Sequence, residues 1–493
     1  MVNGTWSIVK LPPGEKAIGS RWVFKVKNNA DGSIERYKAR IVAKGFSQRP
    51  GQDYFETYAS TMQQDTFRAI LTLAAIEDMY LQSVDISHAF INSDIDTEVY
   101  MKQPEGFEQG GPEYVCKLNK SLYGLKQSPR LWGEKLAAVL GTMGFNKLKS
   151  DPSVYLYVRD DVRIIVPVFV DDITIASKSV EAADKFVEEL SSHFKLRDLG
   201  PTSYLLGVEV TWDQSKHLLY LHQRQYILDK LKEFGMDNCK ARKTPMIPKN
   251  TLSLEQCPKT PEEKQLMLNI PYMNAVGSLM YLAMMTRPDI AYAVGVLARF
   301  NANPGMEHWR AVKHLFRYLK GTLDLKLTLG LDPDIGKELF ITYTDADHGG
   351  CKDSRKSTSG YMVKLGQGVV SWRSKLQPVV TKSTTEAEFV AANDAGKQIL
   401  WIQNLLHELG YTPCAPSVLY IDNNSALSVA KNPDHHGRMK HLDLSYYWLR
   451  EKVAMKKIEP VHLATDNMPA DLLTKPLARV KVEKFRSMMG LRE

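Results

Sequence analysis

Two adjacent aspartates, Asp171 and Asp172, interrupt the otherwise apolar run "VPVFVDDITIAS" at residues 166 to 177. The β-branched and aromatic residues on both sides predict two strands, and the acids fall where these strands reverse. Neighbouring strand residues point to opposite faces, so the two carboxylates share one site only at a turn. At about 4 Å apart they repel by roughly 4 kcal/mol at an effective dielectric of 20. Water at an exposed turn compensates such repulsion, and a bound metal ion is the alternative.

A third acid, Asp85, lies upstream on a short predicted strand, "LQSVDISHAFI". One acid on a strand beside an acidic hairpin is the smallest set of carboxylate ligands for a two-metal phosphoryl-transfer site. Such a site needs carboxylates that converge on two Mg²⁺ ions about 3.5–4 Å apart. The charge of the metals would also cancel the repulsion between the carboxylates.

The segment "EHWRAVKHLFRYLKG" carries a basic stripe at helical spacing. The basic stripe consists of Arg310, Lys313, Arg317 and Lys320, beside an apolar stripe of Trp309, Val312, Phe316 and Leu319. A solvated helix face explains these charges, and contact with nucleic-acid phosphates is the alternative.

The composition sets limits on the class of protein. The chain has 493 residues, 44% of them apolar, and a net charge of +8, which predicts two or three domains and leans toward a polyanionic partner. Its five scattered cysteines show no CxxC pair or Cys/His cluster. This pattern indicates neither a disulfide framework nor a zinc site and fits a reducing compartment. No signal-peptide core and no apolar run of about 20 residues is present, so we expect no membrane span.

The elements that would position these residues follow from hydrophobic periodicity. Residues 20 to 46 predict a basic hairpin, residues 66 to 80 a helix, and residues 240 to 263 a linker or loop followed by helices to about residue 330. Residues 179 to 194 predict an amphipathic helix with a stripe of Ala183, Val187, Leu190 and Phe194.

The pattern changes at residue 339. Three strands precede a helix over 384 to 409, the strand "SVLYID", a helix over 441 to 453, the strand "IEPVHL" and a last helix at "PADLLTKPL". This order predicts a separate α/β domain of about 150 residues.

Taken together, the motifs resemble the reverse transcriptase and RNase H portion of a copia-type LTR retrotransposon Pol polyprotein. They include "RYKARIVAKGF", "SLYGLKQSPRLW", "FVDDITIAS", "SYLLGVEV", "YTDADHGG", "STTEAEFVA", "DNNSAL" and "PADLLTKPL", in the order of the family and over nearly the whole chain. The resemblance implies an α+β right-hand polymerase followed by an α/β RNase H-like domain. Its implied domains are fingers and palm over 1–215, thumb and connection over 216–335, and the RNase H-like domain over 336–493.

The resemblance implies that Asp85 and Asp171 bind both polymerase metals and that Asp172 completes the acidic cluster. The substrate contacts it implies are Arg40 and Lys38 for the triphosphate, Phe90 as steric gate against a ribose 2′-OH, Gln127 for the nucleotide pocket, Lys195 as general acid, Gly207 in the primer grip, and Arg310, Lys313 and Arg317 for nucleic acid. A core aromatic is the alternative for Phe90, and a solvated surface cation is the alternative for Lys38 and Lys195.

The C-terminal domain would cleave the RNA of an RNA–DNA hybrid by a second two-metal site. The ligands implied there are Asp345, Glu388, Asp422 and Asp471. The implied cofactor is Mg²⁺, two ions in each active site, with Mn²⁺ as a substitute. The implied partners are RNA template, DNA primer, RNA–DNA hybrid, dNTPs, a tRNA primer and other retrotransposon proteins, without a membrane, in a cytoplasmic virus-like particle with access to the nucleus.

A catalytically silent relic or a domesticated nucleic-acid-binding protein is the rival interpretation. All seven acidic ligands are present in an uninterrupted frame, which favours the enzyme. One departure concerns Pro167, which removes a backbone donor from the strand before the aspartate pair. We therefore expect that strand to lie at a sheet edge or to carry a bulge.

Two neighbouring acids, Glu386 and Glu388, yield a first prediction. They lie about 200° apart around a helix axis, so only one faces the metal cleft. The family match and the small residues Ala391 and Ala392 favour Glu388, whereas Glu386 would sit in the first turn after a cap at Thr384. We expect Glu388→Gln to abolish hybrid cleavage and to leave primer extension intact, and Glu386→Gln to leave cleavage nearly normal. The reverse pattern in a cleavage assay would place the helix register two residues away.

Overall fold

The β-branched segments around the aspartate pair form β9 (Val162–Phe169) and β10 (Asp172–Ser177) of a six-stranded sheet with the order β11-β4-β10-β9-β8-β7. The other strands are β4 (Tyr80–Ile86), β7 (Asn146–Lys147), β8 (Val154–Arg159) and β11 (Leu196–Pro201). Helices α2 (Ser128–Thr142) and α3 (Val180–His193) pack on this sheet through a shared apolar core. The stripe predicted for residues 179 to 194 joins that core, as its amphipathic spacing requires.

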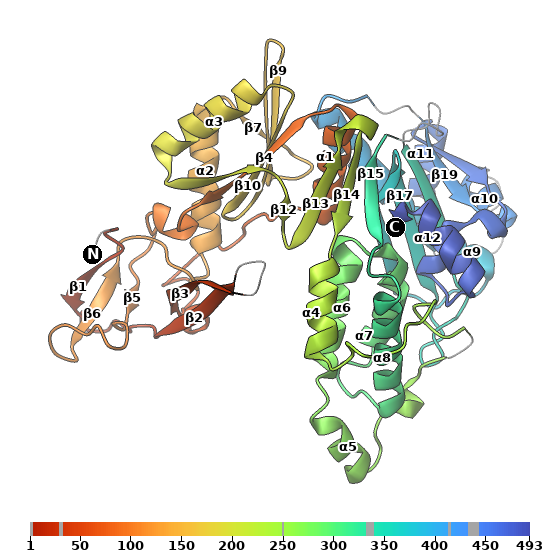
Figure 1. Ribbon diagram of the computed structural model, residues 1–493, viewed down its shortest axis with the longest axis horizontal. Helices are drawn as coiled ribbons and strands as arrows, with labels where there is room; N and C mark the ends of the chain where they lie inside the picture. The colour runs from red at the N-terminus through yellow and green to blue at the C-terminus, as the bar shows by residue number, and fades with distance from the viewer. Residues whose placement is uncertain (1–2, 29–32, 249–250, 332–339, 413–415, 432–442) are drawn as a thin grey trace. The chain divides into compact units, whose positions relative to one another are not determined.

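The structure is a computed structural model (Figure 1). It describes residues 3–28, 33–248, 251–331, 340–412, 416–431 and 443–493. Its contacts define an N-terminal unit, residues 1–62 with 80–201, and a C-terminal unit, residues 63–79 with 202–493. The three-domain division expected from the sequence stays a prediction. No helix in the described ranges is long and apolar enough to cross a membrane.

The predicted basic hairpin is confirmed in the N-terminal unit. Strands β2 (Ser20–Asn28) and β3 (Ile34–Ala43) pair antiparallel, with Val23 opposite Arg40 and Lys25 opposite Lys38. Strand alternation puts these cations on one face of the hairpin and exposed Phe24 and Tyr37 on the other. A second small sheet consists of β1 (Trp6–Lys10), β6 (Tyr114–Leu118) and β5 (Tyr100–Met101).

The expectation for the strand that contains Pro167 is wrong. Strand β9 lies inside the sheet, between β8 and β10, and its register with β10 is the same before and after Pro167. On one side, Pro167 pairs with Val154, the first residue of β8. On the other side, the pairing between β9 and β10 is interrupted at Val166 and Pro167. The amide hydrogen that Pro167 lacks therefore leaves a local gap in the hydrogen bonding between β9 and β10, and β9 has no bulge.

In the C-terminal unit, α1 (Gln64–Ile76) packs against two sheets, one of them ordered β12-β13-β14-β15-β21. Those strands are β12 (Tyr204–Leu205), β13 (Val208–Asp213), β14 (Leu218–His222), β15 (Lys326–Gly330) and β21 (Leu491–Arg492). The fully buried Arg68 of α1 donates to the Val370 carbonyl at 2.6 Å, pairs with Asp65 and lies 3.9 Å from the ring centre of Trp372. These interactions compensate the burial of its charge.

The helical region expected up to residue 330 contains α4 (Arg224–Glu233), α5 (Pro261–Leu268), α6 (Tyr272–Met285), α7 (Ala291–Ala298) and α8 (Met306–Lys320). The predicted loop before α5 is held against α8. The Arg242 amide donates to the Arg317 carbonyl at 3.0 Å, and the His314 ring lies 2.9 Å from the Thr244 carbonyl.

The last sheet has the order β18-β17-β16-β19-β20, and α9 (Thr384–Glu408) covers one face of it (Figure 1). Its strands are β16 (Phe340–Ala346), β17 (Thr358–Leu365), β18 (Gly368–Leu376), β19 (Ser417–Ile421) and β20 (Ile458–His462), and its further helices are α10 (Asn424–Lys431) and α11 (Asp443–Ala454). The prediction of a last helix at "PADLLTKPL" is wrong. A 3₁₀ turn spans Pro469–Leu473, and the last helix, α12, follows at Arg479–Met488. Pro476 lacks the amide hydrogen that would continue a helix there.

Candidate active sites

The three acids of the N-terminal unit lie on neighbouring strands of one sheet and the turn between them. Asp172 begins β10 and lies directly opposite Asp85 of β4 in the antiparallel register. Asp171 occupies the β9–β10 turn, and its carbonyl accepts a hydrogen bond from the Ile86 amide at 2.8 Å. All three residues are half-buried. Carboxylates directly opposite on two strands repel each other, and Arg197, directly opposite Asp85 on the other neighbouring strand β11, partly offsets this repulsion.

The turn that carries Asp171 is strained. Val170 has φ of 58°, a left-handed conformation that is unfavourable for a β-branched residue. The indole of Trp132 donates a 2.7 Å hydrogen bond to the Val170 carbonyl, and its ring packs edge-on against Phe194. Trp132 thereby holds the strained turn from α2. The sequence analysis did not identify this role, although Trp132 ends the quoted motif "SLYGLKQSPRLW".

A chain of aromatic contacts leads from the basic hairpin toward the acids. The Arg40 guanidinium lies 4.7 Å from the ring centre of Tyr123, and the Phe90 ring packs edge-on against the same tyrosine at 4.8 Å. Burial raises the pKa of Tyr123, which is also sensitive to the charges of Arg40, Asp171 and Asp85. Arg40, Phe90 and the acids therefore lie around one side chain, Tyr123, which the sequence analysis missed.

The remaining predicted substrate-binding residues of this unit are Gln127, Lys195 and Lys38. Gln127 is fully buried and donates to the Asp53 carbonyl at 2.9 Å, so it shapes the surrounding loops instead of facing an open pocket. Lys195 is exposed, and its carbonyl accepts a 2.8 Å hydrogen bond from the amide of Ser87, two residues after Asp85. Lys38 is half-buried opposite Lys25.

Gly207 lies in the C-terminal unit, at the turn between β12 and β13. Leu206 and Gly207 have φ of 52° and 76°, as in a two-residue hairpin turn with both central residues left-handed. A side chain at Gly207 would collide with the Tyr281 hydroxyl. Close packing against α6 is therefore one reason for glycine here.

The basic stripe lies on α8, as predicted. Arg310, Lys313 and Arg317 line a pocket of about 400 Å³ together with Arg242 and several apolar side chains. Arg310 pairs with Glu307, whereas the buried Nε of Arg317 has no hydrogen-bond partner among the described residues. Three arginines and a lysine around one pocket suit a negatively charged ligand.

The acids of the last sheet converge most closely. Asp345 lies near the end of the central strand β16, Asp422 follows the adjacent parallel strand β19, and Glu388 lies on α9, which packs on β16. Carboxylate oxygens of these three residues lie within 4.8 Å of one another. A buried cluster of Ala346, Ala387 and Ala391 lets the helix approach the strand. The predicted small-residue packing around Glu388 is therefore present.

The electrostatics of this cluster fit a divalent cation. The buried Oε2 atom of Glu388 has no hydrogen-bond partner in the described part of the chain. Burial, and then the charges of Asp345 and Asp422, raise the pKa of Glu388 far above its usual range. Burial and the charge of Asp345 likewise raise the pKa of Asp422. A carboxyl whose folded-state pKa is raised destabilises the fold once the pH exceeds its unfolded-state pKa, so at neutral pH a bound cation would relieve this cost.

Asp471 is buried in the 3₁₀ turn that lies against β16 and β17. Two neighbours tie this turn to Asp345: the Thr474 hydroxyl donates to its carboxylate, and the Lys475 ammonium lies 3.3 Å from its Oδ2. Gly360, directly opposite Asp345 on β17, leaves the space for this approach. The sequence analysis missed these roles, although Thr474 and Lys475 lie in the quoted motif "PADLLTKPL".

Glu386 does not join the acidic cluster. The cap of α9 is Ser383, not the expected Thr384, because the Ser383 hydroxyl accepts the Glu386 amide hydrogen bond at 3.2 Å. The Glu386 carboxylate in turn accepts the Lys382 amide at 2.7 Å. These two hydrogen bonds tie Glu386 to the residues that begin α9, which explains its burial by a structural role.

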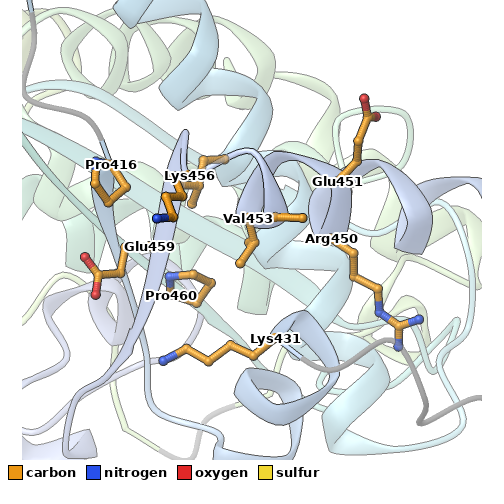
Figure 2. Close-up of a pocket in the computed structure, with 10 residues that line it drawn as sticks. Pro416, Lys431, Arg450, Glu451, Val453, Lys456, Glu459 and Pro460 are labelled. Carbon is orange, nitrogen blue, oxygen red and sulfur yellow. The ribbon is translucent and has the colours of Figure 1, made fainter.

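A separate pocket of about 700 Å³ opens beside β20 and α11. Figure 2 shows Lys431, Lys456 and Pro460 around it, with the Glu451 carboxylate pointing away. None of the predicted site residues lines this pocket, so it is not part of either acidic site.

Comparison with known proteins shows which proteins this chain resembles. Residues 3–248 match the family described as reverse transcriptase (RNA-dependent DNA polymerase). Over 492 residues the chain is 43% identical to the retrovirus-related Pol polyprotein from transposon TNT 1-94 of Nicotiana tabacum, covering 99% of this chain and 37% of that one. It is 33% identical over 319 residues to the putative transposon Ty5-1 protein of Saccharomyces cerevisiae, covering 64% of this chain and 100% of that one. A foamy viral protease-reverse transcriptase structure in complex with double-stranded DNA aligns with 14% identity and a TM-score of 0.48, over 93% of this chain and 67% of that chain.

The fold is mixed α/β, as the sequence predicted, and residues 3–248 carry the reverse transcriptase match. The RNase H-like character of the last sheet stays a prediction. The chain belongs to the retrovirus-related Pol polyproteins of copia-type transposons, and its first half is a reverse transcriptase domain. It spans 37% of the tobacco relative and 33% of the RE1 polyprotein of Arabidopsis thaliana.

The packing of the Asp471 turn on β17 yields a prediction for Gly360→Ala. A Cβ at this position would lie 2.7 Å from Thr474 Cγ2 and 2.8 Å from Leu473 Cβ, so the turn must move away from Asp345. We expect a loss of about 1–3 kcal/mol in the free energy of unfolding, measured in urea, and weaker hybrid cleavage. Gly277→Ala is the control, because a Cβ on that exposed position of α6 meets nothing within 4 Å. Equal stability of both variants would contradict the proposed role of Gly360.

Proposed function

We propose that this chain is an RNA- and DNA-templated DNA polymerase that also cleaves the RNA of RNA–DNA hybrids, both with two Mg²⁺ ions in each site. The observation that carries the polymerase proposal is the placement of Asp172 directly opposite Asp85, with Asp171 in the adjoining β9–β10 turn, in a reverse transcriptase domain. Acids directly opposite on two strands repel each other, so their placement supports a role in holding cations, although Arg197 opposite Asp85 on β11 already supplies one positive charge.

The residues of the chain have distinct parts in this proposal. Asp85, Asp171 and Asp172 hold the cations, Arg40 binds the triphosphate of the incoming dNTP, and Phe90 excludes a ribose 2′-OH. Tyr123 fixes Arg40 and Phe90 relative to each other. When bound, divalent cations supply activation of the attacking oxygen and stabilisation of the leaving group.

The second activity is proposed for the acids of the last sheet. Asp345, Glu388 and Asp422 offer oxygens within 4.8 Å of one another, and Asp471 lies on the turn joined to Asp345 through Thr474 and Lys475. The buried Oε2 of Glu388, which has no hydrogen-bond partner among the residues that the structure describes, supports a cation there, with Mn²⁺ able to replace Mg²⁺. RNA–DNA hybrid is the proposed substrate of this site.

The polymerase proposal is tested by Asp85→Asn. The amide keeps the shape of the side chain and removes a charge that holds the cations, so we expect primer extension with Mg²⁺ to fall by more than about a hundredfold. Hybrid cleavage by the same preparation should persist. Asp161→Asn, at an exposed acid in the β8–β9 turn of the same sheet, is the control and should extend normally. Robust extension by the Asp85 variant would remove Asp85 from the site.

The same assay distinguishes the rival function, a silent or domesticated nucleic-acid-binding protein. That protein would bind hybrid but extend no primer, with or without Mg²⁺. Wild-type extension that EDTA abolishes supports the enzyme.

The basic stripe of α8 should act through phosphate charge. Each phosphate contact contributes a slope of about 0.7 to 0.9 in log K against log salt. We expect the double variant Arg310→Ala with Arg317→Ala to lower the slope of hybrid affinity by about two contacts. The matched control is Arg224→Ala with Arg479→Ala, which removes two exposed arginines paired with Asp324 and Glu483. If both double variants keep the wild-type slope, the stripe is only solvated.

A further inference from the structure

Lys475 places a positive charge inside the acidic cluster of the last sheet. Its ammonium nitrogen lies 2.9 Å from Asp471 Oδ1 and 3.3 Å from Asp345 Oδ2. It therefore bridges two of the four carboxylates proposed to hold cations. The remaining two, Glu388 and Asp422, form a close group with Asp345, and the charge of Lys475 also reaches them.

The backbone around Lys475 fixes where its side chain begins. The amides of Thr474 and Lys475 both donate to the Asp471 carbonyl, at 3.2 and 3.1 Å, which closes the turn after the 3₁₀ segment. The spacing of four residues from Asp471 lets the lysine reach back over the acid. The side chain itself is 35% exposed, so its four-carbon stem has room to swing toward solvent.

An ammonium between two carboxylates does part of what a divalent cation would do there. It neutralises one unit of negative charge and occupies the space between the oxygens, and it must leave before a cation contacts both acids. Removing it therefore has two opposite consequences: the cation-free cluster becomes more repulsive, and the free carboxylates attract cations more strongly.

We propose that Lys475 is an internal counter-ion that occupies the Asp345–Asp471 edge of the cluster and makes its two cation sites unequal. This inference rests on the proposed RNase H site. The Asp345–Glu388–Asp422 group binds the first divalent cation, and the second cation binds more weakly because it must displace the ammonium of Lys475. Lys475 is thus a positioning residue that acts through Asp345 and Asp471.

The test measures Mn²⁺ binding to the full chain by the loss of the free-ion electron paramagnetic resonance signal. The background carries Asp85→Asn and Asp171→Asn, so that the polymerase site does not contribute. We expect two Mn²⁺ ions of different affinity, and in Lys475→Met a weaker site strengthened by about tenfold or more, because a unit charge has left its surroundings. Lys475→Arg keeps the charge and should keep the sites unequal.

The melting temperature in EDTA gives a second readout. Lys475→Met should melt at a lower temperature than its background without metal and should recover with saturating Mn²⁺. The control is Lys481→Met, whose ammonium pairs with exposed Asp466 at 2.9 Å, and it should change neither Mn²⁺ affinity. Lys475→Gln serves in both measurements if the methionine variant does not fold.

The outcomes separate this inference from the proposed function. Unchanged Mn²⁺ affinities in Lys475→Met or Lys475→Gln would overturn the counter-ion role while leaving the metal site in place. The proposed RNase H site would instead be contradicted if the background variant bound no Mn²⁺, or if Glu388→Gln left its Mn²⁺ binding unchanged.

Discussion

Repulsion between converging carboxylates is the constraint on which both candidate sites depend. In the N-terminal unit, the antiparallel register sets Asp172 directly opposite Asp85. In the last sheet, parallel β16 and β19 bring Asp345 and Asp422 to the same end, and α9 adds Glu388 from above the sheet. Neither arrangement is favourable without a compensating charge. The surrounding structure must therefore be rigid enough to hold the acids together.

That rigidity comes from residues that carry no charge chemistry of their own. Trp132 binds the carbonyl of the strained Val170, and Gly360 leaves room for the turn that carries Asp471. The alanines at the α9–β16 contact allow the helix to approach until Glu388 reaches the cluster. In each case a contact of an uncharged residue fixes the position of an acid, and the carboxylate of that acid is the candidate metal ligand.

The sequence predicted local elements well where periodicity was strong. The basic hairpin, the amphipathic helix α3 and the helix with Glu388 all form where expected. It failed where a neighbouring strand or a single residue decided the outcome. Pro167 was expected at an edge, but β8 and β10 flank its strand and absorb one lost hydrogen bond. In place of the helix expected at "PADLLTKPL" a 3₁₀ turn ends at Leu473, and the cap of α9 is one residue before the expected threonine.

The sequence by itself determined the acids, their order and the strands and helices that carry them, because residue type and spacing are local properties. Only the tertiary structure decided that α1 packs with the C-terminal unit, where buried Arg68 contacts Trp372 and the Val370 carbonyl. It also decided that Tyr123 joins Arg40 to Phe90 and that Lys475 lies between Asp345 and Asp471. These contacts depend on the distance and direction of side chains brought together by folding, and most join residues far apart in the chain. Spacing along the chain does not encode such distances.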